Sequence, residues 1–358
     1  MLRKCLAAAA LVVSLGTAAQ TQVSDYRPGI TTEGITYFLP ETHVRFVLTA
    51  TRHLHTPGEY AQYAERYMGI ADVPTETYEE WTLDSVEMLP YGIPASSKAY
   101  TIALNPKSSA PLVSLTPEGI LLAVNEEVEQ PDELPEAGCV PLPSPDIREN
   151  NYLSADILRA STRSKKAELI AQEIYDIREN RSLLAKGQAD FNPSDGNQLK
   201  TMLLTLSESE QALTSFFTGK ATAERHTFVV DFCPKESTEP TLFFRFSKYL
   251  GLVDNDDLAG EPYYIAVTDE SRLPETVDDG KNGKKKEKPD LRYCVPGRAR
   301  ITLSSTTQKI TEAVIAVAQM GRIEHLSGEL FNKKFSAHVL LNPVTGNIER
   351  ISMDEDKE

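Results

Sequence analysis

The sequence predicts an α+β fold in which β-rich N- and C-terminal regions flank a central antiparallel helical hairpin. Two long central segments, near residues 162–186 and 195–218, carry apolar residues spaced by three and four, as on one face of a helix. On both sides, short runs of β-branched and aromatic residues alternate with proline and glycine, which is typical of strands and turns. The 358 residues are 41% hydrophobic and 25% charged, an ordinary globular composition with room for two domains or one large one.

The second central helix has the clearest pattern. Its apolar stripe consists of Leu199, Met202, Leu203, Leu206, Leu213, Phe216 and Phe217. Ser194 or Asp195 can cap its start, because either side chain accepts hydrogen bonds from free backbone N–H groups, and Gly219 suits its end. The stripe of the first helix consists of Leu169, Ile170, Ile174, Ile177 and Leu184, with Arg181 interrupting it. The connection 187–193 is short enough to force antiparallel packing. Aliphatic stripes of this kind indicate a core, not a cofactor site.

The first twenty residues have the pattern of a cleaved signal peptide. Arg3 and Lys4 form a basic start, an apolar run follows, and small residues surround a cleavage point near residues 19–20. The apolar run is too short for a stable membrane span. Cys5 precedes that run, whereas a lipid-modified cysteine would follow it, so we do not expect a lipoprotein. We therefore predict a periplasmic or secreted bacterial protein, and no later stretch is apolar enough to cross a membrane.

The net charge of the mature chain indicates which kinds of partner it does not bind. Cleavage removes two basic residues and no acid, which changes the formal net charge from −15 to −17. Such a surface repels nucleic acid and anionic lipid, so we expect neither as a partner. An envelope protein or a small ligand of unknown identity is the expected partner.

The cysteines of the mature chain are Cys139, Cys233 and Cys294. An exported protein can form disulfides, but an odd count leaves one thiol over. Cys233 and Cys294 fall in neighbouring strand-like segments and can form a bridge; isolated free thiols are the alternative. The absence of a C-x-x-C pair gives no support to a redox or zinc-ribbon site.

We expect five regions along the chain. They are a signal peptide (1–20), a β-rich N-terminal region with a short helix (21–125), an acidic Pro-rich linker (126–150), a helical hairpin (151–220) and a β-rich C-terminal region (221–358).

Several sequence signals define elements within these regions. Thr56-Pro57-Gly58-Glu59 predicts the start of the short helix, and Tyr60, Tyr63 and Tyr67 are expected to cover a sheet edge. The linker prediction depends on seven acids and five prolines between Glu126 and Asp146. We expect turns at four prolines, a flexible basic hairpin tip within 275–290, and a reverse turn at 342–346. The four prolines are Pro90, Pro94, Pro106 and Pro117.

Several short pieces in a fixed order resemble the domain-of-unknown-function family DUF4831, secreted proteins of Bacteroidota. They include Tyr63-Ala64-Glu65-Arg66-Tyr67-Met68-Gly69, Pro90-Tyr91-Gly92-Ile93-Pro94, Phe217-Thr218-Gly219-Lys220, Phe244-Arg245-Phe246-Ser247 and Val317-Ala318-Gln319-Met320-Gly321. The resemblance extends over nearly the whole mature chain. It implies export and lineage but transfers no catalytic residue, because these pieces consist largely of Gly, Pro, aromatic and aliphatic residues. It also implies Ser85, in Asp84-Ser85-Val86, as an acceptor for O-glycosylation of the kind this lineage uses.

His53 and His55 are the best sequence candidates for a metal site. Residues two apart on a strand face the same side, so both imidazoles can reach one ion, and His43 can supply a third. Surface histidines at a strand end are the alternative, and we assign no metal or cofactor. His226, His325 and His338 are isolated in the sequence. Asp254-Asn255-Asp256-Asp257 does not have the spacing of an EF-hand loop and predicts a solvated turn.

No catalytic motif is present: the chain lacks G-x-S-x-G, S-x-x-K, H-E-x-x-H, a P-loop and G-x-G-x-x-G. The leading hypothesis is therefore an envelope protein that acts by binding, as an assembly partner or a ligand-binding module; an enzymatic activity is less expected but stays open. The alternative is a periplasmic hydrolase of glycans or peptides that uses carboxylates, whose pairing in space a sequence does not reveal, or a metal at His53 and His55. A purely structural role is a third possibility.

Overall fold

The computed structural model describes residues 22–25, 34–103, 112–143, 148–190, 195–272, 290–327, 331–332 and 335–354. The predicted signal peptide, most of the basic segment 275–290, Pro106 and the last four residues lie outside these ranges.

The described chain is β-rich, and its helices come from two separate stretches of the sequence. The strands are β1 (Gln22–Asp25), β2 (Gly34–Thr56), β3 (Tyr78–Ala103), β4 (Val113–Leu115), β5 (Leu121–Val124), β6 (Gly138–Pro141), β7 (Lys220–Phe232), β8 (Thr238–Ser247), β9 (Gly251–Val253), β10 (Glu261–Asp269), β11 (Leu291–Ser305), β12 (Lys309–Leu326), β13 (Phe331–Asn332), β14 (Phe335–Leu341) and β15 (Ile348–Asp354). The helices are η1 (Ala61–Tyr63), α1 (Ala64–Met68), η2 (Glu149–Tyr152), α2 (Ala155–Arg159), α3 (Arg163–Ala185) and α4 (Gly196–Thr218).

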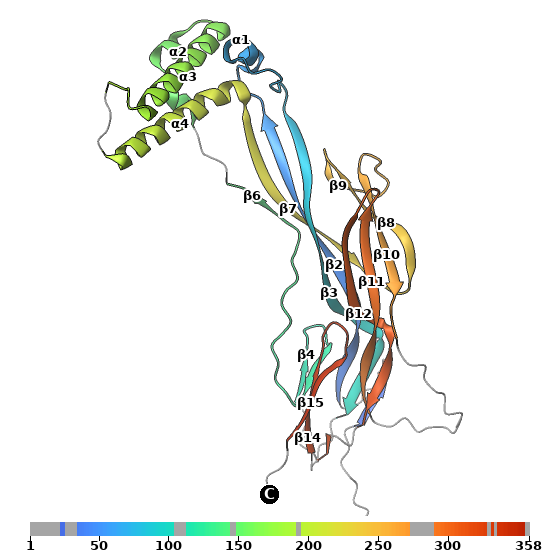
Figure 1. Ribbon diagram of the computed structural model, residues 1–358. Helices are drawn as coiled ribbons and strands as arrows, with labels where there is room; N and C mark the ends of the chain where they lie inside the picture. Colours follow the sequence, from blue (N-terminus) through green and yellow to red (C-terminus); the bar gives the residue numbers. More distant parts are fainter. Residues whose placement is uncertain are drawn as a thin grey trace, which may run out of the picture.

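A long antiparallel ribbon forms the axis of the molecule (Figure 1). β2 has 23 residues, which at about 3.3 Å per residue makes it roughly 75 Å long. It pairs with β3 along most of its length and with β7 over its second half, in a sheet of order β1-β3-β2-β7-β6. The sequence pattern predicts separate strands near residues 37–39 and 44–49, and again near 80–89 and 98–104, whereas the structure has one continuous strand in each region.

Proline explains why that division is wrong in β3. Pro90 and Pro94, predicted as turns, lie inside β3 and pair with Val44 and Pro40 of β2. β3 pairs with β1 only through residues 100–103, so near these prolines its other edge has no partner strand in the described chain. Proline is tolerated there because its missing N–H removes no ladder hydrogen bond. Pro117, by contrast, lies in a turn between β4 and β5, as predicted.

A second antiparallel sheet, of order β12-β11-β10-β8-β9, packs on one face of the ribbon. Their shared core contains alternate residues of β2 and of the facing strands: Val44, Phe46, Leu48, Ala50, Phe244, Phe246, Tyr263, Ile265, Ile301 and Leu303. A third, small sheet contains β4, β5 and β13 to β15, and lies at the end of the ribbon opposite the helices (Figure 1). The N- and C-terminal β-rich regions therefore share sheets instead of forming separate layers.

The helices form a head at the other end of the ribbon, built from η1, α1 and η2 to α4 (Figure 1). The predicted boundaries of its two long helices are confirmed: Thr162 caps α3, Asp195 caps α4, and Gly219 follows α4 with a φ of 81°. A Cβ at Gly219 would lie 2.2 Å from the carbonyl oxygen of Thr56, so this close approach of the ribbon requires glycine. α3 and α4 pack together, and Arg178 and Arg181 both pair with Glu210 (2.6 and 2.5 Å).

The helical head has its own hydrophobic core, separate from the core between the two large sheets. The buried residues of that core come from α1 to α4 and from Tyr60, which directly precedes η1: Tyr60, Ala64, Met68, Ile157, Ala167, Ile170, Ala171, Ile174, Ile177, Leu213 and Phe217. The expectation that three tyrosines cover a sheet edge is wrong. Tyr60 is 4% exposed in the head core, and Tyr63 and Tyr67 pack against it. The tyrosines join the head because α1 follows β2 after a short turn and so lies beside the other helices at the end of the ribbon.

Residues 126–143 of the segment predicted as a linker run along the molecule from the small sheet towards the helical head (Figure 1). Most of its described residues are exposed, as its composition suggests. β6, within it, pairs with β7 over four residues and extends the ribbon sheet by one edge strand.

Candidate functional site

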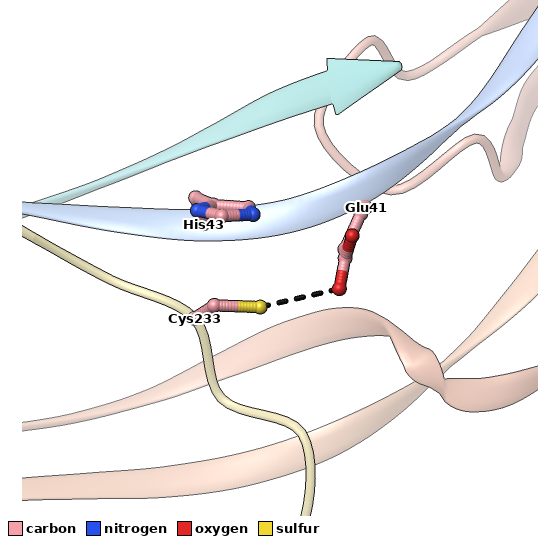
Figure 2. Close-up of side chains that lie close together, drawn as sticks. All are labelled: Glu41, His43 and Cys233. Carbon is pink, nitrogen blue, oxygen red and sulfur yellow. Dashed lines mark hydrogen bonds between the residues drawn. The ribbon is translucent and has the colours of Figure 1, made fainter. Parts of the chain in front are cut away.

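Three side chains of different metal-ligand types converge where the ribbon meets the second sheet. Glu41 and His43 lie two apart on β2 and share a face, and Cys233 follows the last residue of β7. Since Val44 pairs with Phe232, the register places Cys233 beside His43. One ligand atom from each of the three lies within 4.8 Å of the others, and all three residues are half-buried (Figure 2). We call this group the Cys233 cluster.

A network of hydrogen bonds fixes the backbone between the two β2 residues. Thr42 is fully buried, its hydroxyl donates to the Val344 carbonyl (2.9 Å), and the same oxygen accepts from the Ala318 N–H (2.9 Å). Gln319 accepts from the Thr42 N–H (2.9 Å) and donates to the Thr42 carbonyl (2.8 Å). Its amide also donates to the Pro234 carbonyl (2.7 Å), next to Cys233. The family piece containing Gln319 therefore positions both sides of the cluster.

The thiol of this cluster is protonated at neutral pH. Its Sγ donates to Oε1 of Glu41 at 3.3 Å. Burial, together with this carboxylate, raises the pKa of Cys233 to about 11. Reactive cysteines have lowered pKa values, so Cys233 does not have the character of a thiolate nucleophile.

An ion pair and an aromatic side chain lie next to this cluster on the ribbon. Arg45 binds both carboxylate oxygens of Asp231 (2.8 and 2.9 Å) and lies 5.4 Å from the ring centre of Tyr91. These hydrogen bonds hold the pKa of Asp231 below its usual range, against the opposing effect of burial. The ring of Tyr91 also lies 5.8 Å from that of His43.

Tyr91 links the cluster to a cavity of about 810 Å³. Residues 89–94, 130–135, Pro343 and Val344 form most of its wall. A Cβ at Gly92 would lie 2.1 Å from the Pro343 carbonyl oxygen, which explains the glycine in the Pro90–Pro94 piece. The volume falls within the range of small-molecule sites.

A second group of similar composition lies further along the ribbon. Cys139 Sγ lies 3.4 Å from Nε2 of His226, and Glu224 Oε2 lies 3.4 Å from the same nitrogen. We call it the Cys139 cluster. It differs from the first group in two respects, because Cys139 is exposed on edge strand β6 and Glu224 already pairs with Arg52 (3.4 Å). His226, although isolated in the sequence, lies on β7, and cross-strand pairing brings it to a cysteine 87 positions away.

The structure does not bring His43 to His53 and His55, so His43 does not supply the third ligand of that candidate site. His43 and His53 lie on one continuous strand, ten residues and thus roughly 33 Å apart. His53 is exposed, and His55 stacks on Tyr78 with ring centres 5.0 Å apart. The strand continues through the expected break, and this is why His43 joins Glu41 and Cys233 instead.

The remaining sequence candidates have simple positions. Cys139, Cys233 and Cys294 are all free, so the possible Cys233–Cys294 bridge is not formed. Cys294 is buried, and its Sγ donates to the Ala318 carbonyl at 3.3 Å. Residues 254–257 form the predicted turn, in which the Asp257 N–H donates to the Asp254 carbonyl. Ser85 is exposed on β3, and its glycosylation stays a prediction that the intact mass of the mature protein would test.

The comparison with known protein families agrees with the sequence resemblance. The family described as "Domain of unknown function (DUF4831)" matches residues 33–349. The chain belongs to this family. Neither a curated protein nor a solved structure matches it. In the part of this DUF4831 protein that the structure describes, no helix combines the length and apolarity needed to cross a bilayer.

Proposed function

We propose that this DUF4831 protein is an exported envelope protein that acts by binding, and that its helical head engages a partner protein. The export half of the proposal is supported by the signal-like residues 1–20, with cleavage near residues 19–20 and no lipid anchor. The binding half is supported by one feature of α4.

The apolar stripe of α4 continues past the end of the head core. Leu213 and Phe217 are buried near the ribbon, whereas Met202, Leu203 and Leu206 towards the free end are only partly covered. Leu204 beside them is 54% exposed. Exposed apolar side chains that gather in one place are typical of protein interaction sites.

A groove between α3 and α4 accompanies this exposed stripe. Its volume is about 540 Å³, and its apolar lining residues are Leu183, Leu184, Ala189, Met202 and Leu206. Methionine and leucine adapt to apolar segments of different shape. The groove therefore suits an apolar segment of a partner protein. The helices α3 and α4 that line it lie at one end of the molecule (Figure 1).

Site-specific photo-crosslinking in the native envelope tests this proposal. A photoreactive residue at Leu203, in the partly covered end of the apolar stripe, should give one discrete adduct with an envelope protein. The matched control is Glu208, an exposed position on the same helix, which should give none. Absence of an adduct at Leu203, or equal adducts at both positions, would contradict the proposal.

A hydrolase of glycans or peptides is the second candidate, and the Cys233 cluster beside the 810 Å³ cavity is the feature that favours it. Because the thiol is protonated, such a reaction would depend on Glu41 as a base or on a bound metal. Turnover of an envelope-polymer panel that disappears in Glu41→Gln would support this candidate, and no turnover with the metal-supplemented protein would exclude it.

A further inference from the structure

We propose that Glu41, His43 and Cys233 bind one Zn²⁺ ion. Zinc is bound in proteins by cysteine sulfur, histidine nitrogen and carboxylate oxygen, and this cluster offers one of each. The site is independent of the helical head and stands or falls separately from the proposed function.

The distances are close to those that a zinc ion requires. Tetrahedral coordination with bonds of about 2.0–2.3 Å separates neighbouring ligand atoms by roughly 3.3–3.6 Å. Cys233 Sγ and Glu41 Oε1 are already 3.3 Å apart, and the three ligand atoms lie within 4.8 Å of one another. Small side-chain rotations therefore complete the geometry.

The backbone is held in place without using the ligands. The bonds of Thr42 to Ala318, Gln319 and Val344 fix β2 between Glu41 and His43. The Gln319 amide also anchors Pro234 and approaches Cys233 Sγ at 3.7 Å. Both N–H groups of this amide donate to carbonyls, those of Thr42 and Pro234, so Gln319 holds the chain on either side of the site, as outer contacts of metal ligands do.

The ligands themselves are available. In the described chain Glu41 forms no salt bridge, and its one hydrogen bond comes from the Cys233 thiol. The imidazole ring of His43 contacts the ring of Tyr91, and the imidazole nitrogens form no hydrogen bond to a described residue. The Cys139 cluster is less suited, because Arg52 occupies Glu224 and Cys139 is exposed on an edge strand.

Binding is an exchange of a proton for a metal ion. The Cys233 S–H bond breaks as the sulfur–zinc bond forms, and the proton passes to solvent. The thiolate and the Glu41 carboxylate then neutralise the two positive charges, while His43 donates a neutral lone pair. Three protein ligands leave one position for water or another donor, with no change of oxidation state.

The test uses the full mature chain carrying Cys139→Ser, so that the second cluster does not contribute. After chelator treatment, calorimetry with Zn²⁺ and native mass spectrometry should show one ion per chain. Replacing an outer-shell partner typically costs 10–100-fold in metal affinity, so Cys233→Ser, which removes a ligand, should cost at least about 100-fold. Cobalt(II) should produce a thiolate charge-transfer band that Cys233→Ser abolishes.

Further variants keep the inference testable if one of them fails to fold. His43→Gln and Glu41→Gln should each weaken binding, with folding checked by circular dichroism. His53→Ala, an exposed histidine on the same strand, is the matched control and should bind as the parent does. Sub-stoichiometric binding to the parent, or equal affinity of the parent and the folded ligand variants, would overturn the proposal.

Discussion

The helical head and the β-sheet body of this protein are stabilised in different ways. The core of the head is built from α1 to α4 and the short helical turn before α1. The body core instead joins β2 to β8, β10 and β11, which lie about 200 residues or more further along the chain. Most of the head core therefore comes from one stretch of sequence, residues 157–217, to which Tyr60, Ala64 and Met68 add a distant contribution, whereas the body depends throughout on strand pairing between distant segments. We expect damage to the head to remain local and damage to the body to spread.

Removing the largest fully buried side chain of the head core should have the largest effect. Phe217 is fully buried, and Phe217→Ala should destabilise the head by about 3–5 kcal/mol. Hydrogen exchange should rise throughout α1–α4 while β10 and β11 keep their protection. Phe46→Ala in the body core is the counterpart and should open both large sheets. Equal loss of protection in head and body after Phe217→Ala would show that the two are one cooperative unit.

Thr42→Val is the corresponding polar change in the body. It leaves the buried Ala318 N–H and Val344 carbonyl without their partner, which costs about 1–3 kcal/mol. Denaturant unfolding should show a lower midpoint, and Thr42→Ser, which keeps the hydroxyl, should restore most of it. A valine variant as stable as the parent would mean that this network contributes little to the joint between the sheets.

Thr162→Ala should weaken only the start of α3. The Thr162 side chain accepts from the Lys165 N–H at 3.2 Å, and loss of such a cap costs about 1 kcal/mol. Faster exchange should be confined to the first turn of α3. Ser154 precedes α2 without capping it through its side chain, so Ser154→Ala provides the control. Fraying of the body strands in Thr162→Ala would contradict the locality of the head.

The smallest expected effect is a pH dependence in the body. Arg45 lowers the pKa of Asp231, so the pair stabilises the fold above the unfolded-state pKa of about 3.9, and this contribution is lost as the pH falls through the lower folded value. Asp231 is 41% exposed, which limits the effect to less than about 1 kcal/mol. Asp231→Asn should therefore lower stability at pH 7 and match the parent in strong acid. Asp256→Asn, in an exposed turn, controls for loss of charge, and a constant difference at every pH would exclude the mechanism.

The same contrast explains what the sequence could predict. The periods, caps and closing glycine of α3 and α4 are local signals, and the predicted boundaries are confirmed nearly to the residue. The turn at 342–346 is equally local: Asn342 accepts from the N–H groups of Val344 and Thr345. The continuity of β2 and β3 was not predictable, because proline signals a turn unless the free edge of the strand is known.

The candidate site was hidden for a related reason. His43 was a candidate, but with His53 and His55 as its partners. Glu41 is one of 52 acidic residues, and Cys233 lies 190 positions from His43. Only the pairing of β2 with β7 brings them together. One sequence signal pointed in this direction, since Gln319, which anchors Thr42 and Pro234, belongs to a piece of the family resemblance.

The position of β2 in the middle of its sheet also constrains how the chain acquires its structure. β2 and β3 can form a hairpin as soon as both exist, but the other edge of β2 waits for β7, beginning at residue 220. The apolar face of β2 is covered completely only after β11 has been synthesised. Such non-local pairing is slow, and until it is complete the unpaired edge of β2 is prone to aggregation. We therefore expect a truncation before residue 305 to aggregate instead of yielding a folded fragment.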